Sequence, residues 1–219
     1  MPLLNSTKTG TIATELASLS NTLEGFWLEG NQLRGAVPSE FGLLNNLKFW
    51  FANDNSLRGA LPTTLGQLTK LEKLNLNNNG MTGTLPTEWA EMTSLKELQL
   101  GQNNLMGPIP PRYVELWPDL EILKLDNNRL NGTLPFNLNT TKTLKALQLS
   151  NNFITGRLPV DMNPTKLEIL ELDGNRLVGA IPDTIYNMTD LVTLRLGNNR
   201  FSGTIPTQLQ LMTKLGTYR

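Results

Sequence analysis

The stretch LEKLNLNNNGMTGTLPTEWAEMTS, residues 71–94, decides the fold. Leu71, Leu74 and Leu76 open it, and the alternation of leucine with polar residues is that of a short strand with one apolar face. Gly83 suits a close backbone approach or a positive φ, and Pro86 fixes φ and removes a donor, so a second short extended segment ends there. The remainder of the stretch has room only for a 3-10 or helical turn.

The same pattern recurs about every 24 residues along the chain. Its template is LxxLxLxxNxLxGxIPxxLxxLxx, and asparagine, glycine and proline occupy their template positions in all eight copies. Stacked copies of one such unit bury a continuous core between them. We therefore predict a single solenoid over residues 1–219, with a partial repeat at 1–22, eight full repeats at 23–214 and the start of another at 215–219. The full copies begin at Leu23, Leu47, Leu71, Leu95, Leu120, Leu144, Leu167 and Leu191.

The asparagine column follows each predicted strand at the point where the chain turns inward. An asparagine amide both donates and accepts, so it satisfies backbone groups that would otherwise be buried without a partner. We expect these residues to form a ladder that ties repeat to repeat. Its members are Asn31, Asn55, Asn79, Asn103, Asn128, Asn152, Asn175 and Asn199.

The LxxLxLxxN core is the leucine-rich repeat pattern, and its GxIP variant resembles the plant-type leucine-rich repeat family. That family includes the ectodomains of receptor-like kinases and receptor-like proteins, polygalacturonase-inhibiting proteins, and similar arrays in diatoms and other microbes. The resemblance implies an α/β solenoid, a horseshoe or superhelix, with a concave parallel β-sheet and convex 3-10 or short helical turns. It also implies an extracellular or cell-surface location. Most plant members carry cysteine-paired caps, which a chain without cysteine cannot form.

Composition excludes several functional classes. Lys and Arg number 19 against 19 Asp and Glu, so no net field favours nucleic acid or an anionic membrane. The chain has neither cysteine nor histidine, which removes disulfides, the usual zinc ligands and catalytic Ser/His or Cys/His pairs. We expect no cofactor and no metal. The sequence contains no signal-peptide pattern and no apolar run long enough to cross a bilayer, so direct membrane insertion is not expected.

Three exposed aromatic residues are predicted near the first full repeats. In LKFWFANDN, residues 47–55, the template places Trp50 in the core, beside a small Ala52 that compensates for its volume. Phe49 and Phe51 then face the concave surface, and Trp27 of the preceding copy shares the column of Phe51. Exposed aromatic clusters commonly mark recognition sites, so we predict a binding patch here. The alternative is that the three rings only cover each other or further repeats.

A second candidate is charged and lies farther along the concave face, at Lys124, Asp126, Glu171, Asp173 and Arg195. The alternative is a solvated sheet face with weak cross-strand ion pairs. Asp126 and Asp173 share a column two strands apart, roughly 9 to 10 Å, near the upper limit for an inverting glycosidase pair. An open, wet face offers nothing to raise the pKa of one carboxyl group, so no enzyme is predicted.

Two irregularities fall on the predicted convex side. The fourth copy gains a residue around 116–119, and the sixth loses one around 161–166; both are expected to be tolerated loop changes. Sequons occur at Asn5, Asn131, Asn139 and Asn187, which permit N-glycosylation in a secreted protein.

The resemblance favours a non-catalytic recognition module that binds a protein, peptide or glycan on its concave face. Because the array begins and ends within a repeat, we expect it to belong to a larger receptor-like protein. Two alternatives stay open. One is an inhibitor of a secreted cell-wall-degrading enzyme, and the other is a structural or adhesion spacer.

Overall fold

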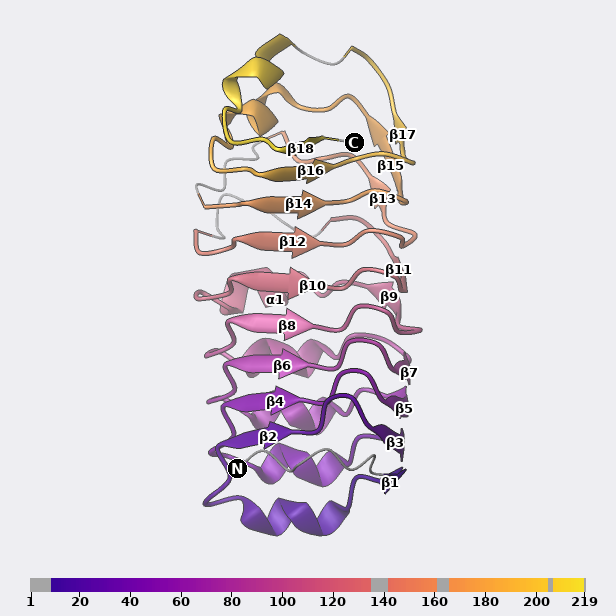
Figure 1. Ribbon diagram of the computed structural model, residues 1–219, viewed down its shortest axis with the longest axis vertical. Coiled ribbons are helices and arrows are strands. Elements are labelled where there is room, and N and C mark those ends of the chain that lie inside the picture. Colours follow the sequence, from indigo (N-terminus) through magenta and orange to yellow (C-terminus); the bar gives the residue numbers. More distant parts are fainter. Residues whose placement is uncertain (1–8, 135–141, 161–165, 205–206, 219) are drawn as a thin grey trace.

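The computed structural model describes residues 9–134, 142–160, 166–204 and 207–218. The repeats stack into an elongated solenoid in which each copy contributes one strand to a long sheet and one segment to a second sheet (Figure 1). Between the two sheets and the helical turns lies one continuous apolar core. The predicted α/β leucine-rich repeat solenoid is thus confirmed.

The long sheet contains nine strands among the described residues, all parallel and in chain order. Their short length follows from the LxxLxL segment, which supplies only three residues of regular alternation per copy. The strands are β2 (Gly25–Trp27), β4 (Phe49–Phe51), β6 (Lys73–Asn75), β8 (Glu97–Gln99), β10 (Ile122–Lys124), β12 (Ala146–Gln148), β14 (Ile169–Glu171), β16 (Thr193–Arg195) and β18 (Thr217–Tyr218).

The second sheet runs along one edge of the stack (Figure 1). Its strands form three parallel groups, and the bridges Thr84–Met106 and Thr133–Thr155 join one group to the next. The groups are β1 (Thr9–Thr11), β3 (Gln32–Gly35), β5 (Ser56–Ala60) and β7 (Gly80–Thr82); β9 (Met106–Pro108) and β11 (Arg129–Asn131); and β13 (Thr155–Gly156), β15 (Arg176–Gly179) and β17 (Arg200–Phe201).

Short helices form the remaining side of the solenoid, as the spacing after each proline predicts. Most are 3-10 turns, which begin directly after the proline where one is present. These turns are η1 (Thr14–Leu19), η2 (Ser39–Leu43), η3 (Thr63–Gln67), η4 (Thr87–Glu91), η6 (Asp183–Asn187) and η7 (Thr207–Leu211).

The fourth copy differs because of its extra residue. It forms α1 (Arg112–Leu116), the one α-helix in the described part of the chain. Trp117 follows it, is 2% exposed and stacks on Tyr113 with ring centroids 4.1 Å apart. The insertion is therefore absorbed on the helical side without disturbing the strand register. The shortened segment of the sixth copy falls largely on residues 161–165, outside the described residues.

The core confirms the predicted registration of the aromatic segment. Trp50 and Ala52 are fully buried. Trp50 packs against Phe41 of the preceding repeat, with ring centroids 5.2 Å apart, and Phe26 of that same repeat contacts both rings. The indole N–H of Trp50 has no hydrogen-bond partner among the described residues, so this side chain is held by packing.

The asparagine column links consecutive repeats through backbone groups. Asn103 Nδ2 donates to Leu76 O of the preceding copy at 3.0 Å and to Leu100 O of its own copy at 3.1 Å, and its Oδ1 accepts from Met81 N at 2.9 Å. The same contacts recur at Asn55, Asn79, Asn128, Asn152, Asn175 and Asn199. Asn31 donates to Leu28 O at 3.0 Å. These bonds provide hydrogen-bond partners for backbone N–H and C=O groups at the point where the chain leaves the sheet.

Candidate binding face on the long sheet

The outward side chains of the long sheet form straight columns because the strands pair in register. We call the column that contains Trp27 the outer column; each of its residues lies opposite the next on the neighbouring strand. It reads Trp27, Phe51, Asn75, Gln99, Lys124, Gln148, Glu171 and Arg195. The predicted aromatic and charged candidates therefore share one face, the aromatic residues at its N-terminal end and the charged ones beyond its middle.

The aromatic end is formed by Trp27 together with Phe49 and Phe51. Trp27 is 46% exposed, whereas both phenylalanines are half-buried. A Cβ atom on Gly25 would overlap the six-membered ring of Trp27, so this ring packs directly against Gly25. Gly25 is the strand partner of Phe49, and Trp27 is the partner of Phe51. The indole therefore lies against β2, beside the two phenylalanines of β4.

The charged part of the face is already connected by hydrogen bonds. Arg195 Nη1 lies 3.3 Å from Glu171 Oε1, and Gln148 Nε2 donates to Glu171 Oε2 at 2.7 Å. On the neighbouring column, Ser150 Oγ donates to Asp173 Oδ1 at 2.5 Å. The expectation of cross-strand pairing is met for Glu171 and Arg195. None of the ion pairs found among the described residues includes Lys124.

Asp126 corrects the prediction that every acid on this face is open to water. It is only 9% exposed, and its Oδ1 has no hydrogen-bond partner among the described residues. The reason is Gly101 in the preceding repeat, because a Cβ atom there would lie 2.5 Å from Asp126 Oδ1. The carboxylate occupies the space that a side chain would fill, and Asn127 Nδ2 donates to its other oxygen at 2.6 Å.

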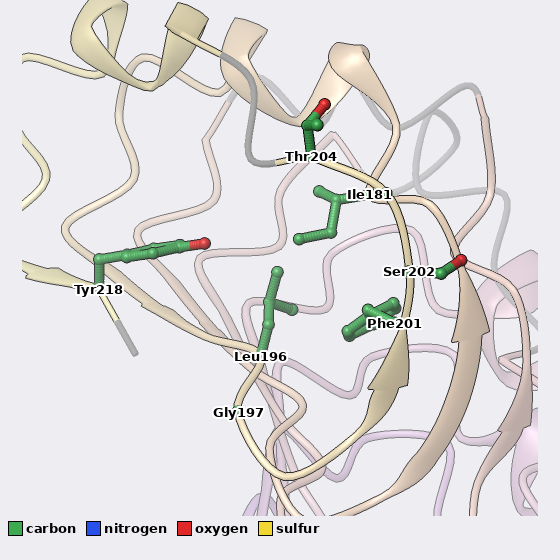
Figure 2. Close-up of a pocket in the computed structure, with 8 residues that line it drawn as sticks. Ile181, Leu196, Gly197, Phe201, Ser202, Thr204 and Tyr218 are labelled. Carbon is green, nitrogen blue, oxygen red and sulfur yellow. The ribbon is translucent and has the colours of Figure 1, made fainter.

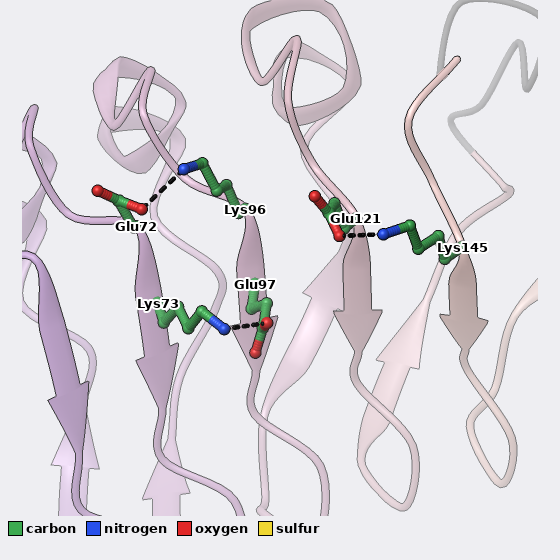
Figure 3. A network of polar contacts seen from close by, with 6 residues as sticks. All are labelled: Glu72, Lys73, Lys96, Glu97, Glu121 and Lys145. Carbon is green, nitrogen blue, oxygen red and sulfur yellow. Dashed lines mark hydrogen bonds and ion pairs between the residues drawn. The ribbon is translucent and has the colours of Figure 1, made fainter. Parts of the chain in front are cut away.

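A column at the start of each strand carries charges of alternating sign, which the sequence interpretation did not use. It reads Glu24, Lys48, Glu72, Lys96, Glu121, Lys145 and Glu168. Each lysine bonds the glutamate of the preceding repeat, at 3.1 Å for Lys48, 2.7 Å for Lys96 and 2.6 Å for Lys145, and the bond from Lys145 lowers the pKa of Glu121. Figure 3 shows the pairs of Lys96 and Lys145 together with an ion pair in the next column, in which Lys73 Nζ lies 2.6 Å from Glu97 Oε1.

These pairs neutralise one edge of the long-sheet face. The signal was readable in the sequence, because the second template position alternates acid and base from copy to copy. Since each cation already has a partner, this edge offers less charge to a ligand than the outer column does. The groups of this face that remain accessible are therefore the aromatic side chains and the polar residues of the outer column.

A separate cavity of about 240 Å³ lies at the C-terminal end of the described core, lined by Ile181, Leu196, Phe201 and Tyr218 among others (Figure 2). Leu196 and Phe201 occupy template core positions of the last full repeat, and Ile181 that of the repeat before it. The cavity is the open end of the core layer rather than a site built on the sheet face.

The other predicted features divide between described and undescribed residues. Asn131 and Asn187 are exposed, as glycosylation would require, whereas Asn5 and Asn139 lie outside the described residues. In the described part of the chain, no group of acidic side chains is arranged to hold a metal ion. None of the helices described is long and apolar enough to cross a membrane.

Comparison with known proteins identifies the repeat. A model for the family Leucine Rich Repeat matches residues 70–92, 166–188 and 190–212. No curated protein sequence matches the chain.

Solved structures give the widest comparison. The chain is 34% identical to a TDR receptor, with a TM-score of 0.91, over 95% of this chain and 36% of that one. It is 31% identical to the ectodomain of the Arabidopsis thaliana membrane receptor kinase GASSHO1/SCHENGEN3 in complex with CASPARIAN STRIP INTEGRITY FACTOR 2, with a TM-score of 0.90, over 95% of this chain and 25% of that one. The chain is 29% identical to the plant peptide hormone receptor RGFR1 in complex with RGF2, with a TM-score of 0.81. The match covers 97% of this chain and 42% of that one.

The chain therefore spans less than half the length of each of these receptor structures. Its repeat template, its paired sheets and its asparagine ladder agree with the family match and with the structural neighbours. The chain contains leucine-rich repeats, and its array is similar to the ectodomains of plant receptor kinases.

Proposed function

We propose that this array is a non-catalytic recognition module that binds a protein, peptide or glycan on the outward face of the long sheet. The observation that carries the proposal is the indole of Trp27, which packs against Gly25 and is exposed beside Phe49 and Phe51 on a parallel sheet. Aromatic side chains bury a large area and lose little conformational entropy, so they serve as anchors. Receptor ectodomains among the structural neighbours support a ligand-binding role.

The polar residues of the outer column would then set specificity. Lys124 has no ion-pair partner among the described residues, while Glu171 and Arg195 already pair with each other. A ligand anchored on Trp27 and extended along the column meets amides first, then Lys124, then the Glu171–Arg195 pair. Because the strands are preformed, binding requires little ordering of the protein.

The proposal includes an extracellular or cell-surface location, as in the receptor ectodomains that the chain resembles. Those structures are longer than this chain, so the array would act as the ligand-binding part of a larger receptor-like protein. Inhibition of a secreted cell-wall enzyme and a purely structural role are the competing functions.

The test is a paired capture experiment with immobilised array. The bait is the parent chain or its Trp27→Ser/Phe51→Ser variant, and the matched control is Leu43→Ser/Leu211→Ser, which removes two exposed apolar side chains from the helical side instead. All three must show the same circular dichroism spectrum. Extracellular extract of the source organism is passed over each bait, and retained species are identified by mass spectrometry.

We expect at least one species to be retained by the parent and the control but lost with the aromatic variant. If that species is a glycanase, and the array inhibits it, the inhibitor function replaces the receptor-like one. Equal retention by all three baits, or none, would contradict the aromatic patch as the binding site.

A further inference from the structure

The second sheet carries charge of a single sign. We call its outward surface the arginine flank, defined by residues 32–36, 56–60, 80–84, 104–108, 129–133, 153–157, 176–180 and 200–204. These segments contain Arg34, Arg58, Arg129, Arg157, Arg176 and Arg200, and they contain no lysine, aspartate or glutamate. All of these arginines are exposed.

The helical side of the solenoid shows the opposite charge. The described helices carry the acids Glu15, Glu40, Glu88, Glu91, Glu115 and Asp183. Their one base is Arg112, whose Nη2 lies 3.3 Å from Glu91 Oε1. The chain as a whole is neutral, with 19 basic and 19 acidic residues, but positive and negative charges are concentrated on different sides of the solenoid.

The arginines of the flank are not consumed by ion pairs. Among the described residues, the ion pairs join side chains of the long-sheet face, the strand starts and the helical side, and none includes an arginine of the flank. The lysines of the strand-start column, by contrast, bind glutamates of the preceding repeat. The positive charge of the flank is therefore available to a partner.

The C-terminal half of the flank presents one arginine per repeat over four successive repeats. The strands that carry them are continuous, since Thr133 bridges Thr155, Thr155 pairs with Arg176, and Val178 pairs with Arg200. The four are Arg129, Arg157, Arg176 and Arg200. Arg129, Arg176 and Arg200 hold the same template position, whereas Arg157 lies four residues farther along its own repeat.

An exposed aromatic residue lies within this row. Phe153 is 42% exposed, and the guanidinium carbon of Arg176 lies 4.6 Å from its ring centroid. Arg157 extends the other way, over Gly179, where a Cβ atom would lie 3.2 Å from its Cγ. The cation–π contact holds Arg176 in place while its N–H groups still face water. The row thus combines ordered guanidinium groups with an apolar ring.

We propose that Arg129, Arg157, Arg176 and Arg200, together with Phe153, form a binding surface for a linear anionic polysaccharide. Guanidinium groups match carboxylate and sulfate oxygens with paired N–H donors, and arginines on four successive repeats fit a polymer whose charges recur along one chain. The edge of Phe153 offers an apolar surface to the C–H groups of a sugar ring.

The form of the surface argues against other polyanions. β13 and β17 are each two residues long, so the surface is narrow. A nucleic acid duplex, much wider than one sugar chain, would lie within about a Debye length of Asp183 at the start of η6. A protein partner needs about 800 Å² of well-packed surface on each side, which a narrow row of exposed arginines does not provide.

This surface is distinct from the long-sheet face, so the two proposals fail independently. The test measures retention of the purified chain on immobilised polygalacturonate, dextran sulfate, double-stranded DNA and neutral dextran, with increasing sodium chloride. We compare the parent with Arg176→Ser/Arg200→Ser and with the matched pair Arg34→Ser/Arg58→Ser, which removes the same charge from the other end of the same sheet. Equal thermal unfolding of all three shows that the fold is intact.

We expect the parent to bind at least one charged polymer at low salt and to ignore neutral dextran. Arg176→Ser/Arg200→Ser should weaken the affinity about tenfold or more, since it removes two charge-assisted contacts, while the matched pair changes it about twofold or less. The polymer retained identifies carboxylate or sulfate as the recognised group. Equal loss in both variants, retention on neither charged polymer, or tighter binding to DNA than to both would overturn the proposal.

Discussion

The six-membered ring of Trp27 occupies the space that a Cβ atom of residue 25 would fill, and residue 25 is a glycine two residues earlier on the same strand. The glycine is what makes this conformation possible, because any larger residue at position 25 would occupy the place of the ring. The orientation of the most exposed aromatic side chain on the long-sheet face is therefore set by the residue type at a neighbouring position of that same face.

The first prediction concerns this contact. Gly25→Ala should displace the ring into solvent and increase collisional quenching of tryptophan fluorescence by acrylamide. The signal reports Trp27, because Trp50, Trp89 and Trp117 are at most 2% exposed. The unfolding free energy should change by less than about 1 kcal/mol, as for most surface substitutions.

The control for this measurement is Gly216→Ala, where the nearest atom to the new Cβ is Val192 O at 3.9 Å. Its quenching should equal that of the parent. Unchanged quenching in Gly25→Ala as well would mean that the ring does not rest on Gly25 in solution.

The second prediction concerns the asparagine ladder. Asn103→Ala removes the partners of Met81 N, Leu76 O and Leu100 O in a buried position, so it should lower the unfolding free energy by about 3 kcal/mol. The exposed neighbour Asn104 serves as control, and its replacement by alanine should cost less than about 0.5 kcal/mol. Urea denaturation measures both, and equal midpoints would refute the role of the ladder.

The third prediction is a pH dependence that arises at Tyr113. Burial raises the pKa of its hydroxyl, which donates to Pro86 O at 2.7 Å. The unfolded chain then releases this proton near pH 10, while the folded chain keeps it, so the unfolded state binds fewer protons and stability falls as pH rises above about 10. Below that pH the contribution is fully present.

Tyr113→Phe tests this dependence in urea denaturations between pH 8 and pH 11. The variant should be less stable by about 1 kcal/mol at pH 8, since Pro86 O loses its donor, and it should lose less stability than the parent above pH 10. Part of the slope should persist, because burial also raises the pKa of Tyr186. An identical slope in both proteins would exclude Tyr113 as its source.

The fourth prediction concerns the ion pair Lys73–Glu97, which joins β6 to β8. Lys73→Glu places two carboxylates on adjacent strands and should destabilise the fold by about 1 kcal/mol, less at high salt. The exchanged pair Lys73→Glu/Glu97→Lys should recover most of that loss. If the double variant is as unstable as the single one, charge complementarity does not explain the effect.

Sequence reasoning predicted the architecture and the core because both follow from the repeat. The template fixed which side chains point inward, so Trp50 and Ala52 were assigned correctly from their positions alone. The 3-10 turns followed from the residues left after each proline. The α-helical turn at Arg112–Leu116 was not predicted beyond a tolerated insertion, since its conformation depends on how Tyr113 and Trp117 stack.

The properties of the candidate surfaces could not be predicted from the sequence, because they depend on contacts between repeats. Asp126 was expected to be solvated, but the absence of a side chain at Gly101, one repeat away, lets it bury. The charged residues of the strand-start column and of the arginine flank can be read directly from the sequence. Which of them pair, and which remain free, depends on distances between side chains of neighbouring repeats.

The sequence by itself thus determined the repeat, the inward and outward columns and the order of the strands, because a period-two alternation repeated every copy leaves one way to bury the leucines. Tertiary structure decided the accessibility and pairing of the outward side chains. Those properties arise between copies about 24 residues apart, where a glycine in one repeat creates the space that an acid in the next repeat occupies.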